Sequence, residues 1–147
     1  LVLTANSRSG LEFHSDKKEV CPMPDNFCVR NCFDKPAENH GHPGSISRVI
    51  IGPDAHRHDR PDALSSERLT IHTNEYEVGG VSGGGHTHSN LEQSYYILEG
   101  AMEVTVGEET CQVGPGDSVF LPRGVFHKHR NIGDKPLNFL FISTIAE

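Results

Sequence analysis

The sequence has no long apolar run and no excess of positive charge, and each absence excludes a class of protein. No segment approaches the roughly 18 apolar residues of a membrane-spanning helix, and no basic leader precedes an apolar segment. Acidic residues outnumber basic ones by 20 to 13, and the net charge is −7, so the basic footprint of a nucleic-acid-binding protein is missing. We therefore expect a cytoplasmic protein with no nucleic-acid partner and no membrane partner.

Cysteine is scarce, and its spacing fits no standard zinc or disulfide pattern. Three cysteines cluster in the N-terminal segment and a fourth stands alone, at Cys21, Cys28, Cys32 and Cys111. We interpret them as reduced thiols of an intracellular protein. A disulfide remains open, as does a Cys/His zinc site that uses His40 or His42.

A helical period is missing too, whereas turn-forming residues are plentiful. The chain has 15 glycines and 9 prolines among 147 residues, and short apolar segments alternate with these turns. Such spacing is typical of an all-β antiparallel sandwich or barrel. We expect an extended arm at residues 1–45, a barrel domain at 46–147 and a loop at 52–66. Strands are expected at residues 45–51, 68–78, 86–88, 93–98, 101–106, 110–113, 118–121, 125–130 and 137–143.

Histidine is what the sequence has in abundance, with ten residues, eight of them in four His-x-His pairs. On a strand, residues i and i+2 point to the same face, so each pair could present two imidazoles side by side. Imidazole is a ligand that suits Zn, Cu, Fe and Ni. The pairs His40/His42 and His56/His58 lie in Gly/Pro loops and are interpreted as solvated, with a lid or an adventitious metal site as the alternative.

The pair His86/His88 has the best context for a metal site. A glycine run precedes it, and the strand that follows brings Gln93 close to it. His127 comes about forty residues later, directly after the rigid turn Pro122-Arg-Gly124. The sequence therefore predicts that three imidazoles and one side-chain oxygen converge from adjacent strands.

These segments closely resemble the cupin superfamily. Gly80, five further residues, His86-Thr-His88 and the closing Gly100 follow the first cupin motif. The run Gly116-DSVFL-Pro122-Arg-Gly124-VF-His127-KHR-Asn131 matches the second motif at every fixed position. The resemblance covers about residues 67–145. It implies a single cupin barrel (a double-stranded β-helix, or jelly roll), one divalent transition metal per chain (Zn, Ni, Mn, Fe or Cu) and a homodimer.

One departure from the motif concerns the ligand that is usually glutamate. Counting back six residues from Gly100 leads to Gln93, whereas counting three residues on from His88 leads to Glu92. Adjacent strand residues point to opposite faces, so only one of the two is expected to reach the metal. The continuous strand into Gly100 favours Gln93, and Glu92 is its rival. The resemblance supports glutamine, because cupins that linearise unsaturated uronates use it here.

A neutral amide ligand has a chemical consequence. Three imidazoles and an amide leave the full +2 charge on the ion, which then polarises a substrate oxygen more strongly. We therefore expect an isomerase or lyase that transfers a proton next to a carbonyl of a small, sugar-acid-like substrate. An Fe or Cu dioxygenase and a non-catalytic module that binds a sugar or another small molecule are the alternatives.

Five further residues are candidates for roles in the pocket. Tyr95 shares the inward face of Gln93, and His129 shares the face of His127, so both are candidates for proton transfer. Packing in the barrel and exposure at its rim are their ordinary alternatives. The candidates for substrate contacts are Arg123, His72 and Tyr76; Arg123 could pair with a carboxylate or could be an exposed turn residue.

Overall fold

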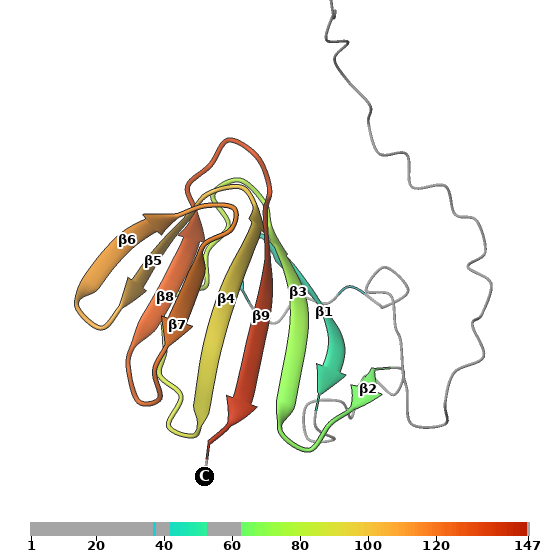
Figure 1. Ribbon diagram of the computed structural model, residues 1–147. Coiled ribbons are helices and arrows are strands. Elements are labelled where there is room, and N and C mark those ends of the chain that lie inside the picture. Colours follow the sequence, from blue (N-terminus) through green and yellow to red (C-terminus); the bar gives the residue numbers. More distant parts are fainter. Residues whose placement is uncertain (1–36, 38–41, 53–62, 147) are drawn as a thin grey trace, which may run out of the picture.

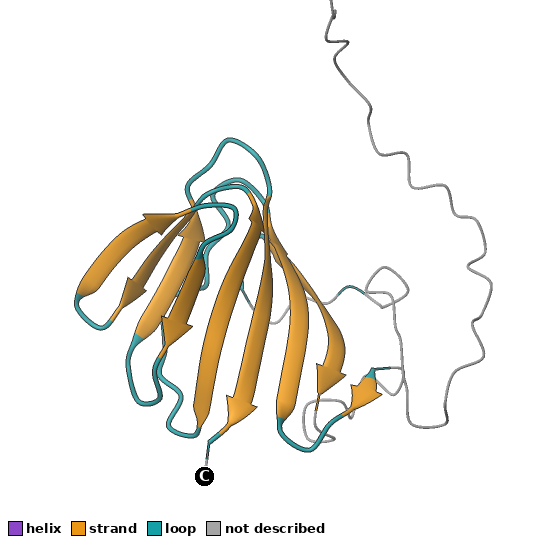
Figure 2. Ribbon diagram, viewed as in Figure 1, coloured by secondary structure: helices purple, strands orange, loops and turns teal. Residues whose placement is uncertain are grey.

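The computed structural model describes residues 37, 42–52 and 63–146, and all of their regular structure is β (Figures 1 and 2). The described part contains no helix long and apolar enough to cross a membrane. The predictions for the N-terminal cysteines and for three of the four loop histidines concern residues outside the described part, namely Cys21, Cys28, Cys32, His40, His56 and His58. Most of the expected arm at 1–45 and of the expected loop at 52–66 also lies outside it. The strands are β1 (Ser45–Gly52), β2 (Leu64–Ser65), β3 (Leu69–Tyr76), β4 (Leu91–Glu99), β5 (Met102–Val106), β6 (Glu109–Val113), β7 (Ser118–Leu121), β8 (His127–Asn131) and β9 (Leu137–Ile145).

The nine strands form two sheets. The large sheet has the order β2-β1-β3-β9-β4-β7, and the small sheet has the order β6-β5-β8. Every neighbouring pair is antiparallel except the short β1–β2 pair. In Figure 1 the large sheet curves, and the small sheet lies beside its β7 edge. The expected all-β jelly-roll barrel is confirmed.

Period-two alternation of side chains builds the core between the sheets. Along β4, Gln93, Tyr95 and Ile97 are buried while the residues between them are more exposed. Met102 and Val104 of β5 are buried from the opposite sheet. Residues of both sheets therefore share one apolar cluster, because each strand contributes every second side chain to it.

Two local expectations are wrong. Residues 86–88 are not a strand: His86 makes only an isolated antiparallel bridge with His127, after a turn-rich glycine segment. The expected loop at 52–66 contains a short strand, Leu64–Ser65, which pairs in parallel with the end of β1. Both differences arise because a two- or three-residue pairing depends on the strand beside it and has little local signal.

Two residues of the recognised motifs have clear structural roles at the turns. Gly100 has φ +88°, and an added Cβ would lie 2.8 Å from the Cα of Leu137, so a side chain would collide with β9. The Asn131 Nδ2 group donates to the carbonyls of Tyr76 and Glu77, both at 3.1 Å, and of Lys135 at 2.8 Å. Both residues thus fix how the strands are connected.

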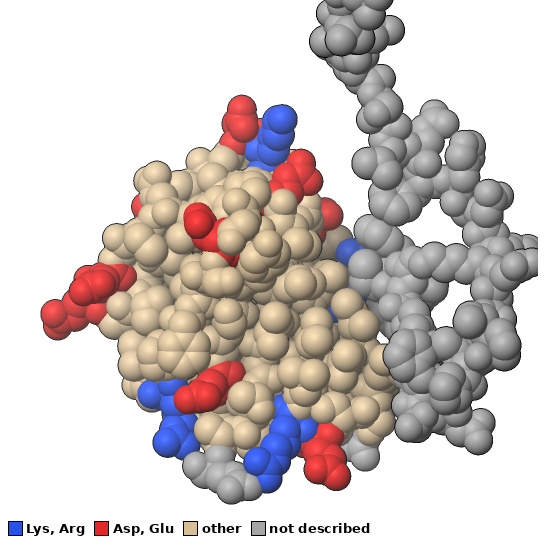
Figure 3. All heavy atoms as spheres, in the orientation of Figure 1, with Lys and Arg blue, Asp and Glu red and all other residues tan. Residues whose placement is uncertain are grey.

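Charge is dispersed on the face seen in Figure 3. Acidic and basic side chains are interspersed, mostly near its margin, and neither sign forms a continuous patch there. One pair is close: Arg130 Nε donates to Glu103 Oε1 at 2.8 Å across β8 and β5. Both side chains are partly or largely exposed, so this pair contributes little to stability.

Candidate metal centre

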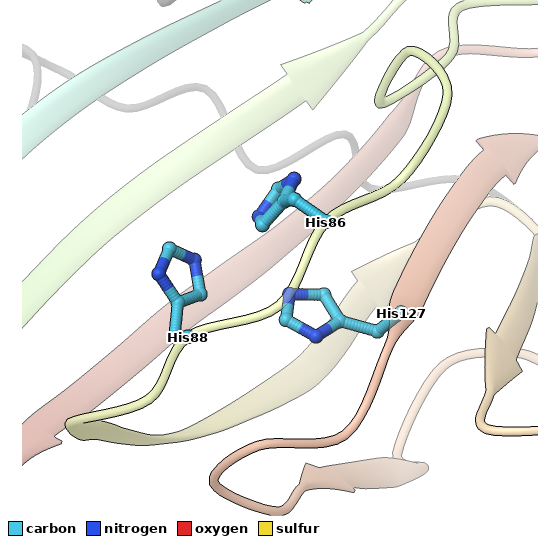
Figure 4. A group of neighbouring side chains, drawn as sticks. All are labelled: His86, His88 and His127. Atoms are coloured by element: carbon cyan, nitrogen blue, oxygen red, sulfur yellow. The ribbon is translucent and has the colours of Figure 1, made fainter.

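Backbone hydrogen bonds hold the His-x-His segment against the start of β8. The amide of His86 donates to the carbonyl of His127 at 3.0 Å, and the amide of His127 returns the bond at 2.9 Å. The amide of Gly124 also donates to the carbonyl of His88 at 2.8 Å. These bonds bring two segments about forty residues apart into one site (Figure 4).

Three imidazoles converge at this junction. One ligand atom from each of His86, His88 and His127 lies within 4.8 Å of the other two. The ring centroids are 4.7 Å apart for His86–His88 and His86–His127, and 5.5 Å apart for His88–His127. Figure 4 shows the three rings turned toward one another. This spacing suits three nitrogens around one transition-metal ion.

One ring nitrogen of His127, Nδ1, already has a hydrogen-bond partner, and this determines that the other, Nε2, is the nitrogen available to a metal. Its Nδ1 lies 3.2 Å from the carbonyl oxygen of Val125; because a carbonyl only accepts, Nδ1 is the protonated nitrogen. Nε2 is then the nitrogen with a free lone pair, and it is buried with no hydrogen-bond partner. An outer hydrogen bond of this kind is how metal-binding histidines are oriented.

Gln93 lies on β4 of the large sheet and carries a side-chain oxygen. Its side chain is 3% exposed, and its Oε1 is buried without a hydrogen-bond partner. Glu92 points the other way and is exposed. A buried, unpartnered amide oxygen is uncommon, because leaving such a group unsatisfied costs free energy. Gln93 lines the same cavity as His88, so an ion bound between these two side chains would satisfy it.

Burial favours the neutral form of three histidines at or beside this junction, His88, His127 and His129. Burial is the main cause that lowers the pKa of His88 and of His127, and neighbouring histidines lower both further. Burial likewise lowers the pKa of His129 to about 3, with the charges of His42, His127 and His86 adding to the effect. Neutral imidazole is the form that binds metals.

A cavity of about 340 Å³ is lined by His88 of this cluster and by Gln93. Four candidate residues line it: Tyr95, His129, His72 and Tyr76. Burial raises the pKa of both Tyr76 and Tyr95, so their phenols stay protonated. The ring of His129 lies 5.0 Å from each of these two tyrosine rings. Arg123 is exposed and is not among the described residues that line the cavity.

Sequence reasoning missed one histidine of the cavity wall. His42, interpreted as part of a solvated loop, lines the cavity, and its Nδ1 lies 2.7 Å from the phenol oxygen of Tyr76. The only signal for it was its membership of a His-x-His pair. Further lining residues lie at alternate positions of strands that the sequence did predict: Ser47, Asn74, Phe139, Phe141 and Ser143.

Comparison with protein families and curated proteins gives two kinds of match. The family model described as "Cupin domain" matches residues 72–143. An uncharacterized protein of Methanocaldococcus jannaschii, MJ1618, is 41% identical over 58 residues, which are 40% of this chain and 46% of that protein. The polyketide synthase CurC of Streptomyces cyaneus is 30% identical over 56 residues, which are 38% of this chain and 36% of that protein. The matched segments thus span less than half of these curated relatives.

Solved structures match over a larger share of the chain. The polyketide cyclase RemF of Streptomyces resistomycificus is 26% identical, with a TM-score of 0.62. The alignment covers 80% of this chain and 79% of that one. The similarity therefore extends beyond the segments that the family model and the curated relatives match.

Proposed function

We propose a function from the premise that this chain belongs to the cupin family, whose domain it carries at residues 72–143. The proposal is a metal-dependent enzyme that moves a proton next to a carbonyl group of a small molecule. The observation that carries it is the cluster of three imidazoles, one of which, His88, lines the same cavity as the unpartnered oxygen of Gln93.

The residues present fit a resident divalent ion. His86, His88 and His127 would each give one nitrogen, and Gln93 would give its amide oxygen. All four ligands are neutral, so the ion would keep its full charge. Such an ion supplies Lewis-acid chemistry by polarising a substrate oxygen, which makes the adjacent C–H bond more acidic.

Tyr95 and His129 are the residues that we propose for proton transfer. At neutral pH the buried phenol of Tyr95 holds its proton, whereas the buried imidazole of His129 is uncharged. Both side chains line the cavity with their rings 5.0 Å apart. One group can therefore donate a hydrogen bond or proton to a substrate while the other accepts one.

The relatives support chemistry of this kind. RemF is named as a polyketide cyclase and CurC as a polyketide synthase. Closing a carbon ring in a polyketide begins with loss of a proton beside a ketone, which is the step proposed here. Ring closure, ring opening and tautomerisation are the reactions that we propose for this chain.

Metal content is the first test. We expect a divalent transition metal close to one ion per chain in protein purified without an affinity tag or added metal. His127→Ala should lose it, because one imidazole is removed from the cluster, whereas Glu92→Gln on the exposed face of β4 should retain it. Wild-type protein that binds no metal under any loading condition would contradict the proposal.

Proton transfer can be tested before a natural substrate is known. We expect metal-loaded protein to speed deuterium exchange at the carbon beside the ketone of 1-tetralone in D₂O, followed by NMR. The His127→Ala variant should exchange at the uncatalysed rate and Glu92→Gln at the wild-type rate. Equal exchange by wild type and His127→Ala would refute metal-assisted proton transfer. Substrate-dependent oxygen consumption without exchange would favour the dioxygenase, and binding with neither reaction would favour the binding module.

A further inference from the structure

The register of the large sheet arranges the cavity wall in rows. His72 of β3 pairs with Phe141 of β9, which pairs in turn with Tyr95 of β4. The His72 and Phe141 ring centroids are 5.1 Å apart, and those of Tyr95 and Phe141 are 6.1 Å apart. The centre of the wall is therefore a continuous row of flat rings, extended by Phe139 at 5.0 Å from Tyr95.

Neutral polar side chains flank this aromatic row on both sides. On one side Thr70, Ser143 and Gln93 are aligned across β3, β9 and β4. On the other side Ser47 and Asn74 pair across β1 and β3, and their side chains are hydrogen-bonded to each other. Hydrogen-bonding groups thus border the aromatic wall along two opposite edges, one of which contains the proposed metal ligand Gln93.

No charged side chain belongs to this wall in the part of the chain that the structure describes. The lining residues there are His, Ser, Thr, Asn, Gln, Tyr, Phe and Leu, without Asp, Glu, Lys or Arg. Arg123, the cation that the sequence suggested for a carboxylate, is exposed and outside the lining. Apart from the proposed metal ion, the described part of this wall offers no cation, so a carboxylate that lies against it away from the ion would lose water without gaining a charged partner, which is costly.

We propose that the cavity binds an uncharged, flat ring compound with ketone or hydroxyl oxygens on opposite edges, and that its side chains by themselves, without the proposed metal ion, disfavour sugar acids and other carboxylates. The ring lies on the row formed by His72, Phe141 and Tyr95, where stacking is favourable. One oxygen faces Gln93 and the histidine cluster, and the opposite oxygen faces Ser47 and Asn74. The statement that one ligand oxygen faces the metal site rests on the proposed function. The flatness and the lack of charge of the ligand are inferred from the cavity wall alone.

Three probes of similar size separate these requirements: 1-naphthol, decahydro-1-naphthol and 1-naphthoate. Isothermal titration calorimetry with protein stripped of metal by a chelator, so that no ion can pair with a carboxylate, should give the lowest Kd for 1-naphthol. We expect decahydro-1-naphthol, which is not flat, to bind about three- to tenfold more weakly. We expect 1-naphthoate to bind at least about tenfold more weakly, because its charge is unpaired in the cavity.

Two matched variants locate the binding. Phe141→Leu removes a ring from the wall. It should weaken the binding of 1-naphthol about three- to tenfold and change the binding of decahydro-1-naphthol little. Phe120→Leu is the control, because Phe120 is 59% exposed and does not line the cavity. Equal binding of the flat and saturated alcohols, or tighter binding of 1-naphthoate, would overturn the proposal. If the protein prefers 1-naphthol but does not catalyse deuterium exchange of 1-tetralone, this inference is supported and the proposed proton transfer is contradicted.

Discussion

At the scale of single residues, the neutral ligand is the most informative position. Gln93 and Glu92 are adjacent on β4, but only Gln93 is buried beside the histidine cluster. The sequence also reduced the choice to these two residues and favoured Gln93, on the register from Gly100. What the sequence lacked was the orientation of the histidine segment, which determines the face of β4 that meets the metal.

Replacing the neutral side chain of Gln93 with a charged one should change both metal affinity and the rate of proton exchange. Gln93→Glu should bind a divalent ion more tightly and catalyse exchange of 1-tetralone more slowly, by about tenfold or more, because a carboxylate cancels part of the ion's charge. Metal titration and the NMR exchange assay measure the two effects. Glu92→Gln is the mirror-image control and should change neither. Faster exchange by Gln93→Glu would contradict the proposed role of a neutral ligand.

His129 carries a predicted pH dependence of stability. Its folded-state pKa of about 3 is far below the ordinary value of 6.5, so the unfolded chain binds a proton that the native chain does not. The free energy of unfolding should therefore be highest above pH 6.5 and fall as the pH drops from about 6.5 toward 3. In metal-free protein, His129→Leu should weaken this dependence by close to one proton, measured by urea denaturation at several pH values. An unchanged slope in the variant would show that His129 is protonated in the native state.

At the scale of elements, the loop before β4 depends on one close approach. Gly85 has φ +87°, and an added Cβ would lie 2.4 Å from Cζ of Phe126 and 2.9 Å from the carbonyl oxygen of His127. That carbonyl accepts the hydrogen bond from His86. Glycine at this position therefore permits the bridge that joins the two halves of the metal site.

Substitution of this glycine should separate the histidines. Gly85→Ala is expected to lower the metal content strongly and to destabilise the fold by about 1–3 kcal/mol, because of backbone strain and the collision with Phe126. Gly84→Ala is the matched control, since nothing lies within 4 Å of its added Cβ and its φ is not positive. Elemental analysis and thermal unfolding measure both effects. Normal metal content in Gly85→Ala would show that the loop adapts.

At the scale of the whole molecule, the proposed ion would link the two sheets. His127 lies on β8 of the small sheet, and Gln93 lies on β4 of the large sheet. A ligand that binds only the folded state stabilises it by mass action. Chelation should therefore lower the Tm of the wild-type protein by about 5–15 °C. The Tm of His127→Ala should not respond to the chelator; a comparable drop in that variant would indicate an effect outside this site.

We also propose that the chain is a homodimer, as the family resemblance implies. Tyr96, Leu98 and Phe120 are 40%, 48% and 59% exposed on the outer side of β4 and β7, which leaves apolar area for a partner. Light scattering should give the mass of two chains, and Phe120→Asp should shift it toward one. A wild-type monomer at micromolar concentration would contradict this proposal.

The sequence by itself determined the all-β class, most strand positions and the three histidines of the cluster. It could do so because turns, period-two alternation and the two spaced motifs are local patterns. Tertiary structure alone decided which strands face which, and therefore the rows of the cavity wall. His42, Phe141 and Asn74 join that wall through the register of β3 and β9 and the path of the chain before β1. Register depends on pairing between distant segments, so the chemistry of the cavity became visible only in the folded molecule.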